Sequence, residues 1–282
     1  MPNPGGAGAG GGAYTPPERD DGSQARMEGE VGMDGTDGPR LELHDALAFY
    51  GRPEFGESVG MGSLLSAMGA EGIGSAVAAS YEQFYAPPDV SNEAAAKAVA
   101  DEPRLRRLIA MAPTSTGELP APESVMDAKA AGLLLCPGKL GMVRRPVFLK
   151  EWFGFAQDRK VPIWYVLQGN ADFEFAADIL ERYPSLRMVL FHSDSWPNSR
   201  KVFPLMDCYG GVCAGTSDII WMGGIEGYVA RFGGGRLVFS TRYPERYVGA
   251  AKRALATADI PEADRRRIAG ANLLELMGGF AL

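Results

Sequence analysis

Residues 161–192 read VPIWYVLQGNADFEFAADILERYPSLRMVLFH, and this stretch decides the fold. It opens on an apolar run at 161–168 and closes on another at 186–192, each with the length of a buried strand. Between them, residues 172–183 have the pattern of an amphipathic helix, with Asp172 as a candidate N-cap. Continuously apolar runs are typical of parallel strands that are covered on both faces. The stretch therefore predicts a β-α-β unit of a parallel sheet.

The same alternation of strands and helices extends in both directions, from Leu41 to the end of the chain. It predicts further strands at 41–44, 74–80, 107–114, 132–137, 211–216 and 236–240, and helices at 63–68, 93–100, 122–131, 148–160, 199–209, 219–232, 248–258 and 261–277. Eight strands with intervening helices over roughly 240 residues match a (β/α)8 barrel. An open doubly wound sheet is the competing fold, and it is disfavoured because no G-x-G-x-x-G follows an early strand.

The composition is that of a globular α/β protein, with 282 residues, 46% hydrophobic and 22% charged. The formal net charge is −7 and no cluster of Lys and Arg stands out, so we expect no nucleic-acid partner. No apolar run approaches the ~18 residues of a membrane span, and no secretory pattern is seen, so we expect no membrane contact and a cytoplasmic location. The three cysteines lack the spacing of metal ligands.

Residues 1–38 differ in composition from the rest of the chain, because they consist mainly of Gly, Ala, Pro and acidic residues. Such a segment cannot bury enough apolar surface to offset the entropy of ordering. We therefore predict a disordered tail, followed by a single barrel domain over 39–282. Met27 and Met33 are alternative starts, so a misassigned start codon is the second interpretation.

Five segments, in order, resemble a known family. They are LLSAMGAEGIGSAVAAS (64–80), GLLLCPG (132–138), ILERYPSLRMVLFHSD (179–194), RFGGGRLVFSTRYPER (231–246) and DRRRIAGANLLELM (264–277). Each is similar to a segment of the amidohydrolase-related group that includes aminocarboxymuconate-semialdehyde decarboxylase and 2-pyrone-4,6-dicarboxylate lactonase. The resemblance implies a TIM barrel of the amidohydrolase type, with its site at the carboxyl ends of the strands.

The resemblance also implies a metal site, which this chain has largely lost. In the family, a divalent metal is held by D/E-x-H-x-H on strand one, a His after each of strands five and six, and an Asp after strand eight. The matching positions here hold Glu42, His44 and Ala46 on strand one, Gln168 after strand five, His192 after strand six and Arg242 after strand eight. A guanidinium stays protonated and cannot ligate a metal. We therefore predict that the chain holds no divalent metal and uses no cofactor.

Two functions remain open on this basis. In the first, the chain is a catalytically degenerate barrel that binds a small carboxylate. In the second, it is a metal-independent, lactonase-like hydrolase or a decarboxylase, in which His192 and His44 serve as acid and base and Arg242 stabilises an anion. Under both, the residues predicted to contact the small-molecule ligand are Gln168, Asn170, Asp194, Trp196, Cys136 and Glu245. A homodimer is a further expectation, because members of the family often associate.

Overall fold

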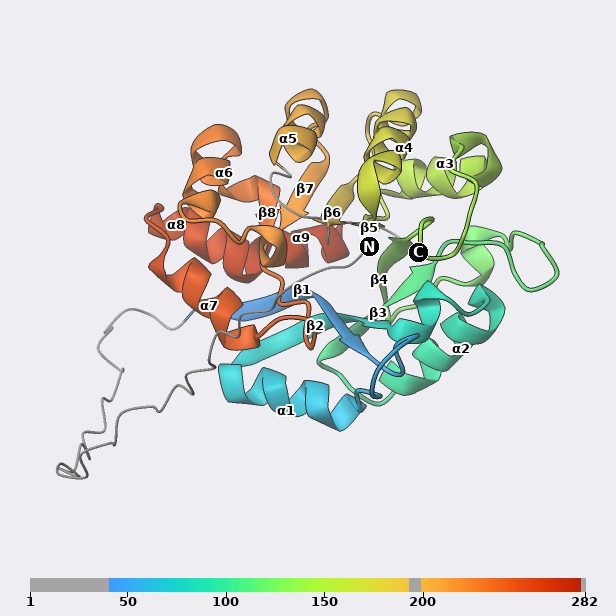
Figure 1. Cartoon of the computed structure of the whole chain (residues 1–282), viewed down its shortest axis with the longest axis horizontal. Helices are drawn as coiled ribbons and strands as arrows, with labels where there is room; N and C mark the ends of the chain where they lie inside the picture. The colour runs from blue at the N-terminus through green and yellow to red at the C-terminus, as the bar shows by residue number, and fades with distance from the viewer. Residues whose placement is uncertain (1–40, 193–198, 280–282) are drawn as a thin grey trace, which may run out of the picture. The chain divides into compact units, whose positions relative to one another are not determined.

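The computed structural model describes residues 41–192 and 199–279, which form a barrel of eight parallel strands (Figure 1). Neighbouring strands pair in chain order; they are β1 (Leu43–Tyr50), β2 (Ile73–Ser80), β3 (Leu105–Ala110), β4 (Ala130–Leu135), β5 (Ile163–Leu167), β6 (Met188–His192), β7 (Val212–Gly215) and β8 (Leu237–Val238). The predicted (β/α)8 barrel is confirmed. The predicted tail at 1–38 lies outside the described residues.

Most helices surround the strands on the outside, as Figure 1 shows, whereas Leu273 of the last helix packs against side chains inside the barrel. They are α1 (Met61–Glu71), α2 (Pro88–Val99), α3 (Lys150–Arg159), α4 (Gly169–Arg182), α5 (Ser199–Cys208), α6 (Gly224–Phe232), α7 (Val248–Thr257), α8 (Glu262–Arg266) and α9 (Asn272–Gly278). Short turns of 3₁₀ helix lie at Tyr81–Phe84, Pro122–Ser124, Pro146–Leu149, Thr216–Asp218 and Gly234–Arg236, and a π turn lies at Arg267–Ala271. The helix predicted at 122–131 is reduced to one such turn. In the described residues, no helix has both the length and the apolar character needed to cross a bilayer.

Alternate residues of the strands build two apolar layers, because successive side chains point to opposite faces of a sheet. The inner layer fills the barrel and includes Leu47, Leu134, Trp164 and Phe191. The Trp164 indole donates a hydrogen bond of 2.6 Å to the carbonyl of Ala46, which joins β5 to β1 across the barrel. The outer layer packs between the strands and the helices. Both faces of every strand are thus covered, which explains the continuously apolar runs in the sequence.

The barrel is closed by contacts between β1 and the segment that contains β8. Backbone hydrogen bonds run from Ala46 N to Phe239 O (2.8 Å), from Arg242 N to Leu47 O (2.8 Å) and from Phe49 N to Tyr243 O (2.7 Å). We call this junction the seam. It places the residues that follow β8 directly against the carboxyl end of β1.

The first strand is longer than predicted, because the prediction ended this strand at residue 44. It continues to Tyr50, and all eight of its residues are buried. The charged residue that looked like a strand end, Asp45, is satisfied within the seam, where it accepts hydrogen bonds from Leu47 N (3.0 Å), Thr241 N (2.9 Å) and Thr241 Oγ1 (2.5 Å). Because these partners come mostly from the far end of the chain, the local pattern could not predict the length of β1.

Candidate ligand-binding site

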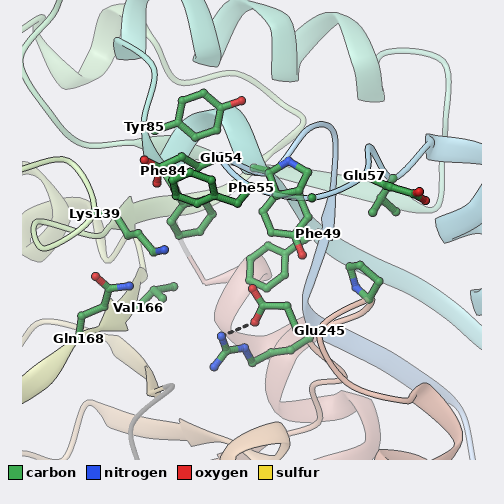
Figure 2. A pocket seen from close by; sticks show the side chains of 16 residues that line it. Phe49, Glu54, Phe55, Glu57, Phe84, Tyr85, Lys139, Val166, Gln168 and Glu245 are labelled. Carbon is green, nitrogen blue, oxygen red and sulfur yellow. Dashed lines mark hydrogen bonds and ion pairs between the residues drawn. The ribbon is translucent and has the colours of Figure 1, made fainter.

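A cavity of about 560 Å³ opens at the carboxyl ends of the strands, and we call it the mouth cavity (Figure 2). Its walls come from β1 and the loop after it, the turn after β2, the loop after β4, the end of β5 and the segment after β8. This is the end of a (β/α)8 barrel where enzymes of the fold place their active sites. A volume of this size suits a small organic molecule.

One side of the mouth cavity is aromatic. The Phe49 ring, at the end of β1, stacks on Tyr81 at 5.2 Å and meets Phe84 edge-on at 5.6 Å, measured between ring centroids. Phe55 and Tyr85 add two further rings to the lining, and Figure 2 shows Phe55, Phe84 and Tyr85 gathered in one part of the cavity. Such a surface favours a flat apolar ligand, because aromatic rings pack well in stacked and edge-on arrangements.

The polar groups of the mouth cavity come from other elements. Lys139 lies in the loop after β4, and Gln168 directly follows β5. The Gln168 side-chain oxygen lies near Gly138, since a Cβ at that glycine would come within 3.2 Å of it. In the described part of the chain, no carboxylate forms an ion pair with Lys139, although Glu54 and Glu57 stand on the loop after β1. Lys139 thus offers the cavity a positive charge that its described neighbours leave unpaired.

Arg242 also lines the mouth cavity, but its charge is already matched. Its Nη1 lies 3.0 Å from Asp218 Oδ1, and its Nη2 lies 2.5 Å from Glu245 Oε2, the ion pair drawn in Figure 2. The Arg242 and Asp218 side chains are only 5% and 1% exposed. Burial alone would lower the pKa of the guanidinium, yet Asp218 and Glu245 outweigh burial and raise that pKa. Arg242 therefore remains charged, with two carboxylates bound to it.

The backbone holds Arg242 in an uncommon conformation. Its φ is 53°, in the left-handed region that non-glycine residues seldom adopt. The seam fixes it there through the hydrogen bond from Arg242 N to Leu47 O, and Nη1 additionally donates to the carbonyl of His192 at 3.3 Å. Strained residues of this kind gather at functional sites, where the surroundings must hold them.

The imidazole of His192 does not face the barrel interior. On β6, Val189 and Phe191 belong to the inner layer, whereas Met188 and Leu190 belong to the outer one. His192 follows the outer set, and its ring centroid lies 6.4 Å from that of Phe173 on α4. It is not among the described residues that line the mouth cavity. The structure thus places this imidazole away from the lining of the mouth cavity, while its role as an acid or base stays a prediction.

His44 lies at the wrong end of the barrel for the role predicted for it. It is the second residue of β1, so it stands at the amino ends of the parallel strands, opposite the mouth. Its Nδ1 lies 2.7 Å from Ser75 Oγ near the start of β2, and its Nε2 lies 3.2 Å from Glu42 Oε1. His44 is therefore remote from Arg242, and the prediction that it serves as an acid or base at the mouth is wrong. The cause is the longer β1, which moves its carboxyl end to Phe49 and Tyr50.

The remaining predicted residues divide into three groups. Gln168 and Glu245 line the mouth cavity. Cys136 is fully buried inside the barrel, and this burial raises the pKa of its thiol. Asn170 is exposed on α4. Neither side chain lines the mouth cavity, so both predictions are wrong in placing them there. Asp194 and Trp196 lie outside the described residues.

Sequence reasoning missed three residues of the site, namely Lys139, Phe49 and Asp218. Lys139 follows the CPG of the fourth strand segment, which was a signal for a loop at the mouth. Phe49 went unnoticed because the strand was ended too early. Asp218 follows β7; it pairs with Arg242 and accepts a hydrogen bond of 3.0 Å from His192 N.

A divalent metal does not fit the residues present at the mouth. Where strands β1, β5 and β8 reach it, the side chains are Phe49, Gln168 and Arg242, of which only the Gln168 oxygen could serve, as a weak neutral ligand. In residues 41–192 and 199–279, no group of three His, Cys, Asp or Glu side chains could hold an ion together.

Comparisons with known proteins show the fold. No protein-family model and no curated protein sequence matches the chain. Among solved structures, 2,6-dihydroxybenzoate decarboxylase in complex with 2,6-dihydroxybenzoate superposes with a TM-score of 0.66, at 15% identity over 85% of this chain and 100% of that one. A Pseudomonas putida protein described as a putative 2-pyrone-4,6-dicarboxylic acid hydrolase superposes with a TM-score of 0.66, at 14% identity over 86% of this chain and 100% of that one.

A dihydroxybenzoic acid decarboxylase from a Polaromonas species, with bound manganese and the inhibitor 2-nitroresorcinol, gives a TM-score of 0.64 at 17% identity, over 85% of this chain and 97% of that one. The chain is thus a (β/α)8-barrel protein with the architecture that these decarboxylases and this hydrolase share. Identities this low establish the common fold, and the function has to be argued from the site.

Proposed function

We propose that the chain is a divergent member of the amidohydrolase-related group that binds a small aromatic carboxylate at its mouth without a divalent metal. Two observations support membership of the group, namely the five sequence segments and the fold shared with decarboxylases and a hydrolase. The observation that carries the binding proposal is the mouth cavity itself, in which aromatic walls face Lys139.

The ligand class follows from the groups that line the cavity. Phe49, Phe84 and their neighbours supply an apolar surface for a ring, and the Lys139 ammonium would pair with a carboxylate. Glu54 and Glu57 would accept hydrogen bonds from hydroxyl groups on the same ring. A hydroxylated benzoate meets both demands, and 2,6-dihydroxybenzoate, the ligand of one structural neighbour, has this chemistry.

Binding is favoured over turnover because the acid and base groups are poorly placed. A general acid or base must come within hydrogen-bond reach of the proton that it transfers. His44 stands at the opposite end of the barrel, and the His192 ring faces α4. Arg242 is engaged by Asp218 and Glu245, so Lys139 takes over the anion-binding role that was predicted for Arg242.

Titration calorimetry tests the proposal with a matched pair of ligands. We expect 2,6-dihydroxybenzoate to bind more tightly than resorcinol, which has the same ring and hydroxyl groups but no carboxylate. Lys139→Ala should weaken binding of the acid by about fivefold, the value of a partly exposed ion pair worth about 1 kcal/mol, and leave resorcinol unchanged. Lys97→Ala, which removes an exposed lysine on α2, is the control. Equal affinity of the wild type for both ligands would refute the role of Lys139.

Metal analysis tests the second part of the proposal. Protein purified in the presence of added zinc or manganese and then desalted should contain far less than one equivalent of metal per chain, because no three His, Cys, Asp or Glu side chains of the described residues come together to hold an ion. Elemental analysis gives the ratio directly. One tightly held ion per chain, lost in an Arg242 or Gln168 variant, would overturn the metal-free assignment.

A further inference from the structure

A second cavity, of about 160 Å³, lies at the amino ends of the strands, and we call it the floor cavity. Arg187 directly precedes β6, Gly211 directly precedes β7, and Arg236 directly precedes β8, so these three residues come together at one end of the barrel. The π turn and α9 complete the wall with Arg267, Asn272 and Glu275. The floor cavity is therefore far from the mouth cavity, at the opposite end of the same strands.

Three guanidinium groups line the floor cavity, and they differ in how they are held. Arg236 is fixed by backbone carbonyls: its Nε donates to Val212 O at 2.7 Å, and its Nη2 donates to Met206 O at 3.0 Å and to Tyr209 O at 2.8 Å. These bonds leave its full positive charge in place, since carbonyls are neutral. Arg236 thus acts as a fixed cation in the wall.

Arg267 is only weakly compensated. Its Nε donates to Asn272 Oδ1 at 3.3 Å, and its Nη2 lies 3.7 Å from Glu275 Oε2. The Glu275 side chain is 75% exposed, so water screens most of that ion pair. The remaining N–H groups of Arg267 are available to a ligand in the cavity.

Arg187 is the least satisfied of the three. Its Nη1 is buried and has no hydrogen-bond partner, and in the described part of the chain no carboxylate pairs with its guanidinium. A buried donor of a charged group without a partner is costly. The cavity also holds three positive charges against the one carboxylate of Glu275, in a chain whose formal net charge is −7. An anion in the cavity would balance this excess of positive charge.

We propose that the floor cavity binds a phosphate group, either as inorganic phosphate or as the terminal group of a phosphomonoester, with Arg187 and Arg267 as its ligands. Guanidinium forks match the oxygens of phosphate, and a doubly charged anion suits a site with an excess of two positive charges. The volume is below the ~300–1,000 Å³ of cavities that enclose drug-sized molecules, which favours a small ion or a single end group. The site is independent of the function proposed for the mouth.

Calorimetric titration with inorganic phosphate, at an ionic strength held constant with chloride, tests the site. We expect saturable binding of one phosphate per chain, weakened about tenfold by Arg187→Gln and by Arg267→Gln, since each removes hydrogen bonds between charged groups. Arg253→Gln, which changes an exposed arginine on α7, should bind like the wild type. Phenyl phosphate separates the two sources, because tighter binding than inorganic phosphate would identify a phosphomonoester as the ligand.

Thiol labelling reports on the same site without relying on affinity. Cys213 lines the floor cavity, whereas Cys208 is exposed outside it. Saturating phosphate should slow the alkylation of Cys213 several-fold and leave Cys208 unaffected, and the protection should disappear in Arg187→Gln. Arg267→Gln, whose side chain is 53% exposed, provides the same comparison should the first variant fold poorly. Binding that is unchanged in both variants, or absent protection of Cys213 in the wild type, would overturn the proposal.

Discussion

At the scale of single residues, the buried ion pair between Arg242 and Asp218 supports one wall of the mouth. The Arg242 guanidinium and the carboxylate of Asp218 are both buried, and they are 3.0 Å apart. Arg242→Gly removes the side chain, and glycine adopts the left-handed φ of 53° without strain. The loss of stability in this variant therefore measures chiefly the ion pair with Asp218. We expect the free energy of unfolding to fall by about 2–4 kcal/mol, because Asp218 is left as a buried charge. Urea unfolding at neutral pH gives the value.

Two variants separate pairing from other effects of Arg242→Gly. Arg246 Nη2 lies 3.6 Å from Asp218 Oδ1, and the Arg246 side chain is 35% exposed. Arg246→Ala should therefore lower the free energy of unfolding by no more than about 0.5 kcal/mol. Adding Asp218→Asn to Arg242→Gly should restore part of the stability, since the unpaired charge is then gone. A loss below about 1 kcal/mol for Arg242→Gly would show that the ion pair stabilises little.

At the scale of elements, the seam between β1 and the β8 segment makes stability depend on pH through Asp45. Burial is the largest cause and raises the pKa of this carboxyl to about 7, even though hydrogen bonds from Thr241 and Leu47 oppose the shift. Between the ordinary value of 3.8 and about 7, the unfolded chain has released this proton while the folded chain keeps it. Stability therefore falls as the pH rises through this window, by up to about 4 kcal/mol, and levels off above it.

Asp45→Asn tests this pH dependence. The amide oxygen can still accept from Leu47 N and Thr241 N, but the group no longer ionises. Urea unfolding between pH 4.5 and 8 should show that, as the pH rises to about 7, the free energy of unfolding falls in the wild type but not in Asp45→Asn. Asp158→Asn, at an exposed position of α3, should show the same pH dependence of stability as the wild type. A constant difference between Asp45→Asn and the wild type over this range would contradict the shifted pKa.

At the scale of the whole molecule, every described contact that closes the barrel lies within residues 41–279. Removal of residues 1–38 should therefore leave both the midpoint of thermal unfolding and the urea m-value unchanged, since m follows the surface exposed on unfolding. Removal of residues 1–46 should abolish cooperative unfolding, because it deletes Asp45 and the Ala46 side of the seam. A lower m-value for the shorter deletion would show that the first 38 residues belong to the folded unit.

The sequence by itself determined the architecture, because barrel strands covered on both faces must be apolar throughout and the helices between them amphipathic. Together with the family resemblance, it also located Gln168, Arg242 and Glu245, which follow the predicted strands five and eight. These predictions depend on local pattern, and local pattern is what a single chain displays.

Tertiary structure alone decided how those residues are used. Asp45 extends β1 because Thr241, 196 positions away, satisfies its carboxylate, and this extension moves Phe49 to the mouth and leaves His44 at the floor. Asp218 pairs with Arg242 from another strand end, whereas Lys139 lines the same cavity with no ion pair in the described part of the chain. The physical reason is common to all of them: burial and electrostatic pairing are set by partners distant in sequence, which no local pattern specifies.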